Sequence, residues 1–416
     1  MIFWRVTLPF LAGYFVSYVY RAINAIIGPE LAREFGLGAG TLGLLTGVYF
    51  AAFAVFQVPL GVLLDRYGPR RVNSTLLLVA AAGGLWFSLA ASGTELTLAR
   101  ALIGVGVSGC LMSTLSAFVV WYPTERLASV NGIAFATGML GAVMATVPLE
   151  MALRTFTWRQ IFYGIFALTL AVSFVLRLVV PERSAGRRGE TLAEQVRGLG
   201  IVLRDPAFWR AAICVCGSQC AAVALGTLWV ATWLRDVAGY TRPEVAQALL
   251  VFSLAMLAGY VGFGRLADRR ARQGKSTLPL LAGGVALSSL TLLALALGVR
   301  TGALLLWTVF FVSATAVVLS YALLSRRYPK EMAGRVNSAV NVFTFAGMFT
   351  GQWAVGLVLS LWPQTPSGGY APEAYRWALG LLWLVQFAGL AWLWTGRRIF
   401  EPGSAAVRIS GFGSNQ

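Results

Sequence analysis

The sequence predicts an all-α membrane protein with twelve transmembrane helices in two pseudo-symmetric six-helix bundles. The composition is the first reason, because 58% of the residues are hydrophobic and only 12% are charged, whereas about a quarter of the residues in a soluble domain are charged. Length is the second, because 416 residues accommodate twelve spans of about 20 residues with short connections. The third reason is that residue patterns of the first half return at the same spacing in the second half.

Six apolar runs are expected to cross the bilayer in each half of the chain. In the first half they lie near residues 6–28, 41–64, 72–92, 96–120, 129–150 and 158–180. In the second half they lie near 207–234, 243–267, 276–299, 301–325, 335–361 and 374–395. Backbone polar groups in lipid have to be satisfied within their own segment, so each run is predicted to be helical. The predicted organisation is a bundle at 1–180, a linker at 181–206, a second bundle at 207–396 and a tail at 397–416.

The net charge of +17 comes mainly from arginines in the short loops between these runs. Loops on one side carry most of them, including Arg66, Arg70, Arg71, Arg126, Arg183, Arg187, Arg188, Arg269, Arg270, Arg397 and Arg398. Such loops are retained in the cytoplasm, so we expect both termini there, in a bacterial inner membrane. Retention of these loops on the cytoplasmic side of the lipid bilayer, and not binding of nucleic acid, then explains the positive net charge. We expect no cleavable signal peptide, because Met1–Pro9 leads directly into the first span.

Several chemistries are disfavoured by residue types. The sequence contains no histidine, which argues against His-based proton relays, zinc-hydrolase motifs and catalytic triads. The cysteines fall inside apolar runs and are expected to be free buried thiols. Only Cys216 and Cys220 share a helix face, without a Met cluster beside them, so a soft-metal site is not expected. We therefore expect no enzyme activity, no metal and no cofactor, and a monomeric protein.

Two motifs occur once in each half of the chain. The first is a Gly–Asp–Arg pattern after the second span of each half, at Gly61, Asp65 and Arg66 and again at Gly264, Asp268 and Arg269. The second follows the fourth span of each half, at Tyr122, Pro123, Glu125, Val130 and Asn131 and again at Tyr328, Pro329, Glu331, Val336 and Asn337. Matching spacing in both halves indicates a duplicated transporter.

The stretch from Gly61 to Arg70 resembles the signature loop between the second and third helices of the major facilitator superfamily. The run from Arg100 to Gly106 is similar to that family's fourth-helix motif. The glycine-rich fifth run lacks the antiporter form of the motif, which argues against drug/proton exchange. The resemblance implies the major facilitator fold and transport by alternating access. It also implies that Asp65 and Asp268 act at a cytoplasmic gate, with Gly61, Arg66, Arg70, Arg100 and Arg269.

Arg21 is the most informative single residue, because it lies deep in the first apolar run. A charge at such depth costs a few kcal/mol even on permissive insertion scales. No Asp or Glu lies at similar depth in any run, so Arg21 is expected to face a watery cavity and to bind an anion. The first run also resembles first helices of organic-anion and organophosphate transporters. The alternative is that Arg21 bonds backbone carbonyls of neighbouring helices.

Other polar and aromatic residues are expected to line the cavity with Arg21. Helical spacing places Tyr14, Ser17, Tyr18 and Asn24 on the same stripe. Candidates from other spans are Gln219, Trp229, Trp233, Tyr321 and Asn341, for which interhelical hydrogen bonding is an equal alternative. The seventh run has no central arginine, unlike organophosphate carriers. That difference favours a monocarboxylate or another small organic anion over a phosphate dianion.

The sequence therefore favours a secondary or facilitative transporter of a small organic anion. Uniport, anion exchange and symport remain open, because the nearest acids, Glu30, Glu95 and Glu150, lie towards the outer ends of the spans. One alternative is an exporter of drugs or neutral metabolites, with Arg21 in a structural role. Another is a non-transporting ligand sensor on the same fold.

Overall fold

The computed structural model describes residues 2–181, 200, 202–325, 328, 333–366 and 368–400. Within these residues the secondary structure is helical, and ten helices are long and apolar enough to cross a membrane. A bent pair, Phe3–Ala22 with Asn24–Phe35, and a shorter apolar helix, Ala303–Val318, occupy two further predicted spans. An all-helical protein with about ten to twelve spans is thus confirmed. Most of the linker and most of the tail predicted from the sequence lie outside the described residues.

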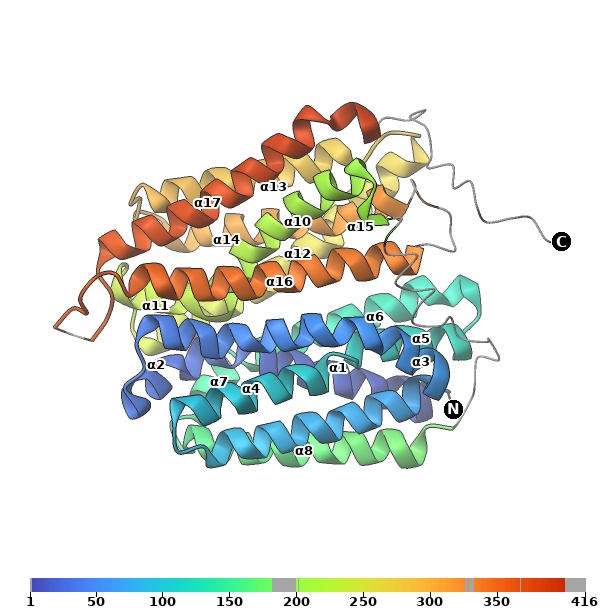
Figure 1. Cartoon of the computed structure of the whole chain (residues 1–416), viewed down its shortest axis with the longest axis horizontal. Helices are drawn as coiled ribbons and strands as arrows, with labels where there is room; N and C mark the ends of the chain where they lie inside the picture. Colours follow the sequence, from blue (N-terminus) through green and yellow to red (C-terminus); the bar gives the residue numbers. More distant parts are fainter. Residues whose placement is uncertain are drawn as a thin grey trace.

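The helices of the first half form one bundle, at the bottom of Figure 1. In chain order they are η1 (Phe3–Thr7), α1 (Leu8–Ala22), α2 (Asn24–Phe35), α3 (Ala39–Leu89), α4 (Gly93–Val107), α5 (Cys110–Trp121), α6 (Thr124–Met144), α7 (Val147–Ala152) and α8 (Trp158–Val179). The helix α3 contains two spans, because Gly68 interrupts it with φ 76° and ψ 160°. Glycine adopts this left-handed φ without steric cost, so the chain turns at Gly68 and Pro69 from the second span into the third.

The helices of the second half form the other bundle, at the top of Figure 1. They are α10 (Pro206–Ala224), η2 (Leu225–Trp229), α11 (Val230–Asp236), α12 (Arg242–Arg272), α13 (Leu278–Ala296), α14 (Ala303–Ala314), η3 (Thr315–Val318), α15 (Leu319–Ser325), α16 (Ala333–Leu359), α17 (Pro372–Thr395) and η5 (Arg397–Phe400). The described spans begin and end within a few residues of the predicted runs.

The two bundles meet where α3 of the first packs along α16 of the second (Figure 1). Glycines allow this close approach: a Cβ on Gly43 would lie 2.8 Å from the Gln352 carbonyl oxygen, and one on Gly47 would lie 3.2 Å from the Phe349 ring. Small residues are the usual means of close helix packing in lipid, where the hydrophobic effect gives little drive between helices. We call this contact the α3–α16 seam.

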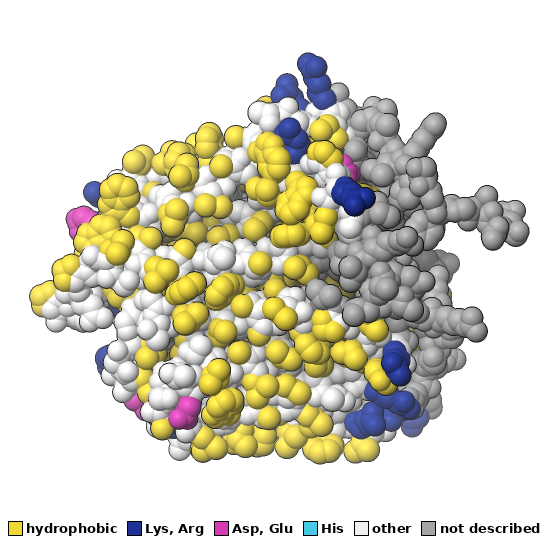
Figure 2. Space-filling model, in the orientation of Figure 1, with side chains coloured by type: hydrophobic (Ala, Val, Ile, Leu, Met, Phe, Trp, Pro, Cys, Tyr) yellow, Lys and Arg dark blue, Asp and Glu magenta, His cyan; other side chains and the backbone are white. Residues whose placement is uncertain are grey.

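Charge separates the two ends of the molecule. On the face seen in Figure 2, most Lys and Arg side chains gather at the end that carries the N-terminus, which we call the arginine-rich end, and apolar side chains cover the middle. The helices α2, α7 and α11 lie at the opposite end (Figure 1). The same pattern predicted the cytoplasmic side from the sequence, and that orientation stays a prediction.

Candidate functional site

Arg21 lies in the last turn of α1, at the seam between the two bundles. Its guanidinium carbon is 4.7 Å from the centre of the Tyr18 ring, 5.8 Å from that of Phe53 and 5.6 Å from that of Phe345. Phe53 belongs to α3 and Phe345 to α16, and their rings stack across the seam with centres 4.0 Å apart. Arg21 is therefore held by aromatic faces from both bundles, an arrangement that stabilises a cation without neutralising it.

The charge of Arg21 has no carboxylate beside it in the described part of the chain. Its Nε is buried without a hydrogen-bond partner there, and the tyrosines Tyr14, Tyr18 and Tyr49 interact with its charge. The ion pairs Arg159–Glu34, Arg235–Asp236 and Arg242 with Glu30 and Glu150 all lie at the opposite end. An anion at the seam would therefore meet an uncompensated guanidinium.

The predicted stripe on the first span is only partly formed. Tyr14 and Tyr18 pack edge to face beside Arg21, with hydroxyls 3.4 Å apart, and the buried Ser17 offers its carbonyl to the Tyr49 hydroxyl. Asn24 departs from the stripe, because the chain bends by 46° between α1 and α2. It is fully buried and donates to Thr46 at 3.1 Å. Helical spacing could not reveal that bend.

The two tryptophans among the second-half candidates make their described hydrogen-bond and ring contacts with residues of their own bundle. Trp229 is fully buried and donates to the Gln352 carbonyl at 3.0 Å, and Trp233 packs edge to face on Trp307 inside its own bundle. Gln219 on α10 and Asn341 on α16 are half-buried. The side chain of Tyr321 lies outside the described residues. The substrate roles of these residues stay predictions.

The predicted gate residues of the first half lie at the arginine-rich end, and their gating role stays a prediction. Gly61 is half-buried in α3, Arg66 is exposed beside Tyr67, and Arg70 donates through Nε to the Arg177 carbonyl at 3.1 Å. The side chain of Asp65 lies outside the described part. The turn from Arg66 to Arg71 borders a cavity of about 130 Å³ with Trp121 and Phe10.

Two predicted gate residues of the second half are exposed, and Arg100 lies elsewhere. Asp268 and Arg269 are solvent-exposed near the end of α12. Arg100 is only 1% exposed inside the first bundle, about two turns into α4, a helix that starts at the opposite end. It is therefore not beside the loop of Arg66 and Arg70 with which the motif grouped it.

A charged cluster that the sequence did not predict joins the bundles at the opposite end. Arg242, at the start of α12, bonds Glu30 of α2 and Glu150 of α7, each at 2.7 Å. The side chain of Glu150 is 8% exposed and that of Arg242 is 43% exposed. The partners are far apart in sequence, so only the fold shows that they meet. We call this cluster the Arg242 latch.

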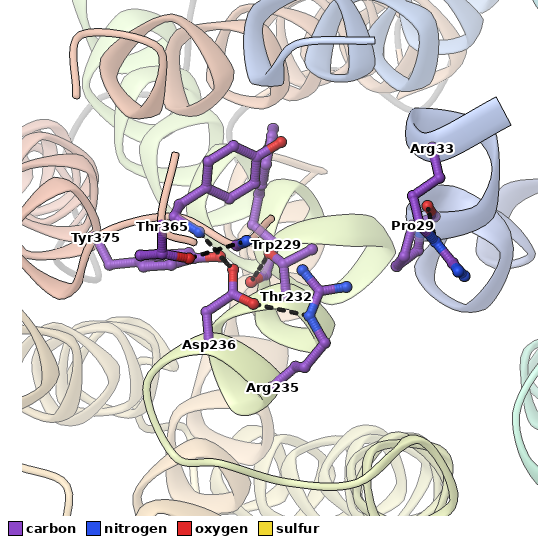
Figure 3. A network of polar contacts seen from close by, with 10 residues as sticks. Pro29, Arg33, Trp229, Thr232, Arg235, Asp236, Thr365 and Tyr375 are labelled. Carbon is purple, nitrogen blue, oxygen red and sulfur yellow. Dashed lines mark hydrogen bonds and ion pairs between the residues drawn. The ribbon is translucent and has the colours of Figure 1, made fainter. Parts of the chain in front are cut away.

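A second polar network, centred on Asp236, lies within the second bundle at the same end as the latch (Figure 3). Asp236, at the end of α11, accepts hydrogen bonds from Arg235 at 2.7 Å, the Tyr370 amide at 3.0 Å and the Tyr375 hydroxyl at 2.9 Å. Burial and the Asp236 carboxylate raise the pKa of Tyr370 above its ordinary value, so that residue stays neutral. The network fixes the segment between α16 and α17 to the end of α11.

One small cavity lies between the bundles in this conformation. A cavity of about 50 Å³ lies directly beyond Arg21 and is lined from the first bundle by Ala22, Ala25 and Thr146 and from the second by Gly226, Phe252 and Phe311. About 10–15 Å³ of such volume holds one water, so this space holds a few waters and is too small for an organic anion.

Solved transporter structures share this architecture. A bacterial homologue of the human lysosomal transporter Spinster, in an inward-facing and unoccupied conformation, matches with a TM-score of 0.78 at 19% identity over 95% of this chain and 97% of that one. The xylose transporter XylE from E. coli, inward open, matches with a TM-score of 0.71 at 16% identity over 97% of both chains. At such identities the likeness concerns the fold alone.

Curated relatives give a similar picture at the sequence level. A probable sulfoacetate transporter of Cupriavidus necator is 24% identical over 62% of this chain and 63% of its own length. The hexuronate transporter of Bacillus subtilis is 28% identical over 41% of this chain and 37% of its own. These matches span less than two thirds of either relative. The family model of the Major Facilitator Superfamily matches residues 10–352, which is more than half of the sequence. The chain therefore belongs to the major facilitator superfamily of membrane transporters.

Proposed function

We propose that this protein moves a small organic anion, a carboxylate, across the bacterial inner membrane by alternating access. The observation that supports the proposal is Arg21, a guanidinium at the seam of the two bundles with aromatic neighbours and no acid beside it in the described residues. Such a group binds carboxylates through two parallel hydrogen bonds. Relatives named for sulfoacetate, hexuronate and galactarate or glucarate are consistent with an anionic substrate.

In the proposed cycle the anion reaches Arg21 from the arginine-rich end. In this structure the α3–α16 seam and the Arg242 latch hold the bundles together at the opposite end. We place the arginine-rich end in the cytoplasm, following the distribution of positive loops. Binding at the seam draws the bundles together around the anion, and opening of the latch then exposes it to the other side.

Substitution of Arg21 tests the proposal. We expect Arg21→Gln to lose at least 90% of the uptake of labelled carboxylates into liposomes, because the substitution removes the only guanidinium at the seam in the described part of the chain. Arg21→Lys is the matched control, and it should keep part of the activity because it keeps the charge and loses the planar fork. Wild-type uptake by Arg21→Gln would refute the anion role.

Export of drugs is the second candidate, since a quinolone resistance transporter of Acinetobacter baumannii is 28% identical over 33% of this chain. It predicts lowered susceptibility of cells to quinolones on overexpression, and no loss of that effect in Arg21→Gln. A panel of organic anions and lipophilic cations in a thermal-shift assay separates the two functions, because a ligand stabilises the state that it binds.

A further inference from the structure

Arg100 is a second buried arginine in the first bundle. Its side chain is 1% exposed, and its Nε and Nη1 have no hydrogen-bond partner within the described residues. Buried polar groups are normally paired, and an unpaired buried charge is the most costly kind. The position of Arg100 therefore needs a reason other than the stability of the bundle.

Tyr49 connects Arg100 to the site of Arg21. The Arg100 guanidinium carbon is 5.0 Å from the centre of the Tyr49 ring. The same tyrosine lies close enough to Arg21 to interact electrostatically with its guanidinium, and its hydroxyl donates to the Ser17 carbonyl at 3.3 Å. Two guanidinium groups thus share one aromatic side chain, and Tyr49 separates Arg100 from the seam.

Close packing fixes Arg100 at this place. A Cβ on Gly83 of α3 would lie 2.8 Å from the Ile103 nitrogen of α4. Gly104, one turn after Arg100, is packed directly against the Tyr49 backbone. Since α4 has no room to shift against α3, Arg100 acts through its electrostatic field and through Tyr49.

The polar neighbours of both arginines are tyrosines and not acids in the described structure, with Tyr49 and Tyr20 beside Arg100. Two like charges in a low-dielectric interior repel each other, and this repulsion is weakly screened. One negative charge at the seam compensates one of them. Two negative charges on a single ligand compensate both, so each charge of the ligand contributes to binding.

We propose that Arg100 is the second positive charge of the anion site and makes the transporter selective for dianions, such as dicarboxylates, over monoanions of the same size. The inference rests on the proposed anion function and names its substrate class. The sequence argued for a monoanion because the seventh span has no arginine; Arg100 supplies the missing charge from the fourth predicted span instead. Arg100 is then a specificity-determining residue that acts without touching the substrate.

Matched ligand pairs test the inference on purified full-length protein. Gluconate and glucarate share a six-carbon hydroxylated chain and differ by one carboxylate, and propionate and malonate form a three-carbon pair. Affinities follow from ligand-dependent thermal stabilisation. We expect the wild type to prefer the dianion of the pair that it binds by at least about tenfold, as two compensated charges require. Arg100→Gln should reduce this preference to about threefold or less, because it weakens binding of the dianion more than binding of the monoanion, and Arg100→Lys should retain it.

Opposite outcomes overturn the inference. An unchanged preference in Arg100→Gln, or a wild type that prefers the monoanion, would remove the role of Arg100 and leave the anion function intact. Binding of both anions by Arg21→Gln as in the wild type, or no stabilisation of the wild type by any of the four, would refute the anion function itself.

Wild-type protein supplies a second measurement in case Arg100→Gln does not fold. Its affinity for malonate is measured on both sides of the ligand's second pKa, with gluconate, which stays a monoanion over that range, as the control for titration of the protein. The sequence has no histidine, so few protein groups change charge in that range. The affinity should fall as the monoanion replaces the dianion, and equal affinity for the two forms would contradict the inference.

Discussion

At the scale of single residues, aromatic rings take the place that a carboxylate holds in most buried arginine sites. A cation–π contact is worth about 0.5–2 kcal/mol, so Tyr18, Phe53 and Phe345 hold Arg21 without a strong bond that a ligand has to break. An anion that approaches the guanidinium displaces weak contacts and gains charge-assisted hydrogen bonds. The cage thus keeps Arg21 in place and available.

Asp236 offers a test of the network at the opposite end. Asp236→Asn removes the negative charge of a carboxylate that accepts three hydrogen bonds. The donors are Arg235, the Tyr370 amide and the Tyr375 hydroxyl. Hydrogen bonds to charged groups contribute about 1.5–3 kcal/mol each at most, so we expect a clear fall in the midpoint of thermal unfolding. Glu244→Gln is the control, because Glu244 is exposed and accepts hydrogen bonds only from the nearby Thr241 amide and hydroxyl in the described residues. Equal midpoints for Asp236→Asn and the wild type would show that the network does not stabilise the fold.

Arg21 was predictable from the sequence, but its surroundings were not. A charged residue inside an apolar run can be recognised from the sequence alone, because the cost of burying it depends on its depth in the run. The neighbours Phe53 and Phe345 come from helices distant in sequence, and their aromatic spacing is equally typical of core packing. The role of Tyr49 between Arg21 and Arg100 likewise depends on how α3 packs against α1 and α4.

At the scale of helices, run length and hydropathy predicted the spans well because lipid allows only continuous helices of a given length. The turn at Gly68 was also predictable, since Gly–Pro at the end of a run interrupts a helix. The bend after Ala22 was not, because the strongest helix breakers nearby, Gly28 and Pro29, lie several residues further on, inside α2. That bend explains why Asn24 left the predicted stripe.

The α3–α16 seam predicts a strong effect of side-chain size at Gly43. A leucine there would collide with the Gln352 carbonyl and the Trp229 ring, because its Cβ would lie only 2.8 Å from the first and 3.2 Å from the second. Backbone cannot yield as a flexible side chain can, so we expect Gly43→Leu to prevent closure at the opposite end and to lower liposome uptake at least tenfold. Gly164→Ala in α8 is the control, with nothing within 4 Å. Wild-type uptake by Gly43→Leu would show that the seam opens and closes without this contact.

At the scale of the whole molecule, the two bundles are joined by contacts of different kinds at the opposite end and in the middle. Glycine packing and the Arg242 latch hold the opposite end closed, while stacking of Phe53 on Phe345 holds the middle. Alternating access requires that neither set be too strong, because the transporter has to populate both states. Arg242 is 43% exposed, which limits the contribution of the latch through solvent screening.

Loss of one latch carboxylate should therefore shift the conformational equilibrium without unfolding the protein. Glu150→Gln removes the more buried partner of Arg242 and leaves Glu30, so we expect closure at the opposite end to weaken by about 1–2 kcal/mol, a shift of roughly 5- to 30-fold towards the state open at that end. Spin labels at the exposed positions Arg33 of α2 and Pro243 of α12 report the separation of the bundles there, and the longer-distance population should grow in Glu150→Gln. Glu34→Gln is the matched control, because Glu34 pairs with Arg159 inside the first bundle and its loss leaves the contact between bundles unchanged. If both variants gave the wild-type distance distribution, the bundles would be held together at this end by the glycine seam, and the latch would have no part in the transport cycle.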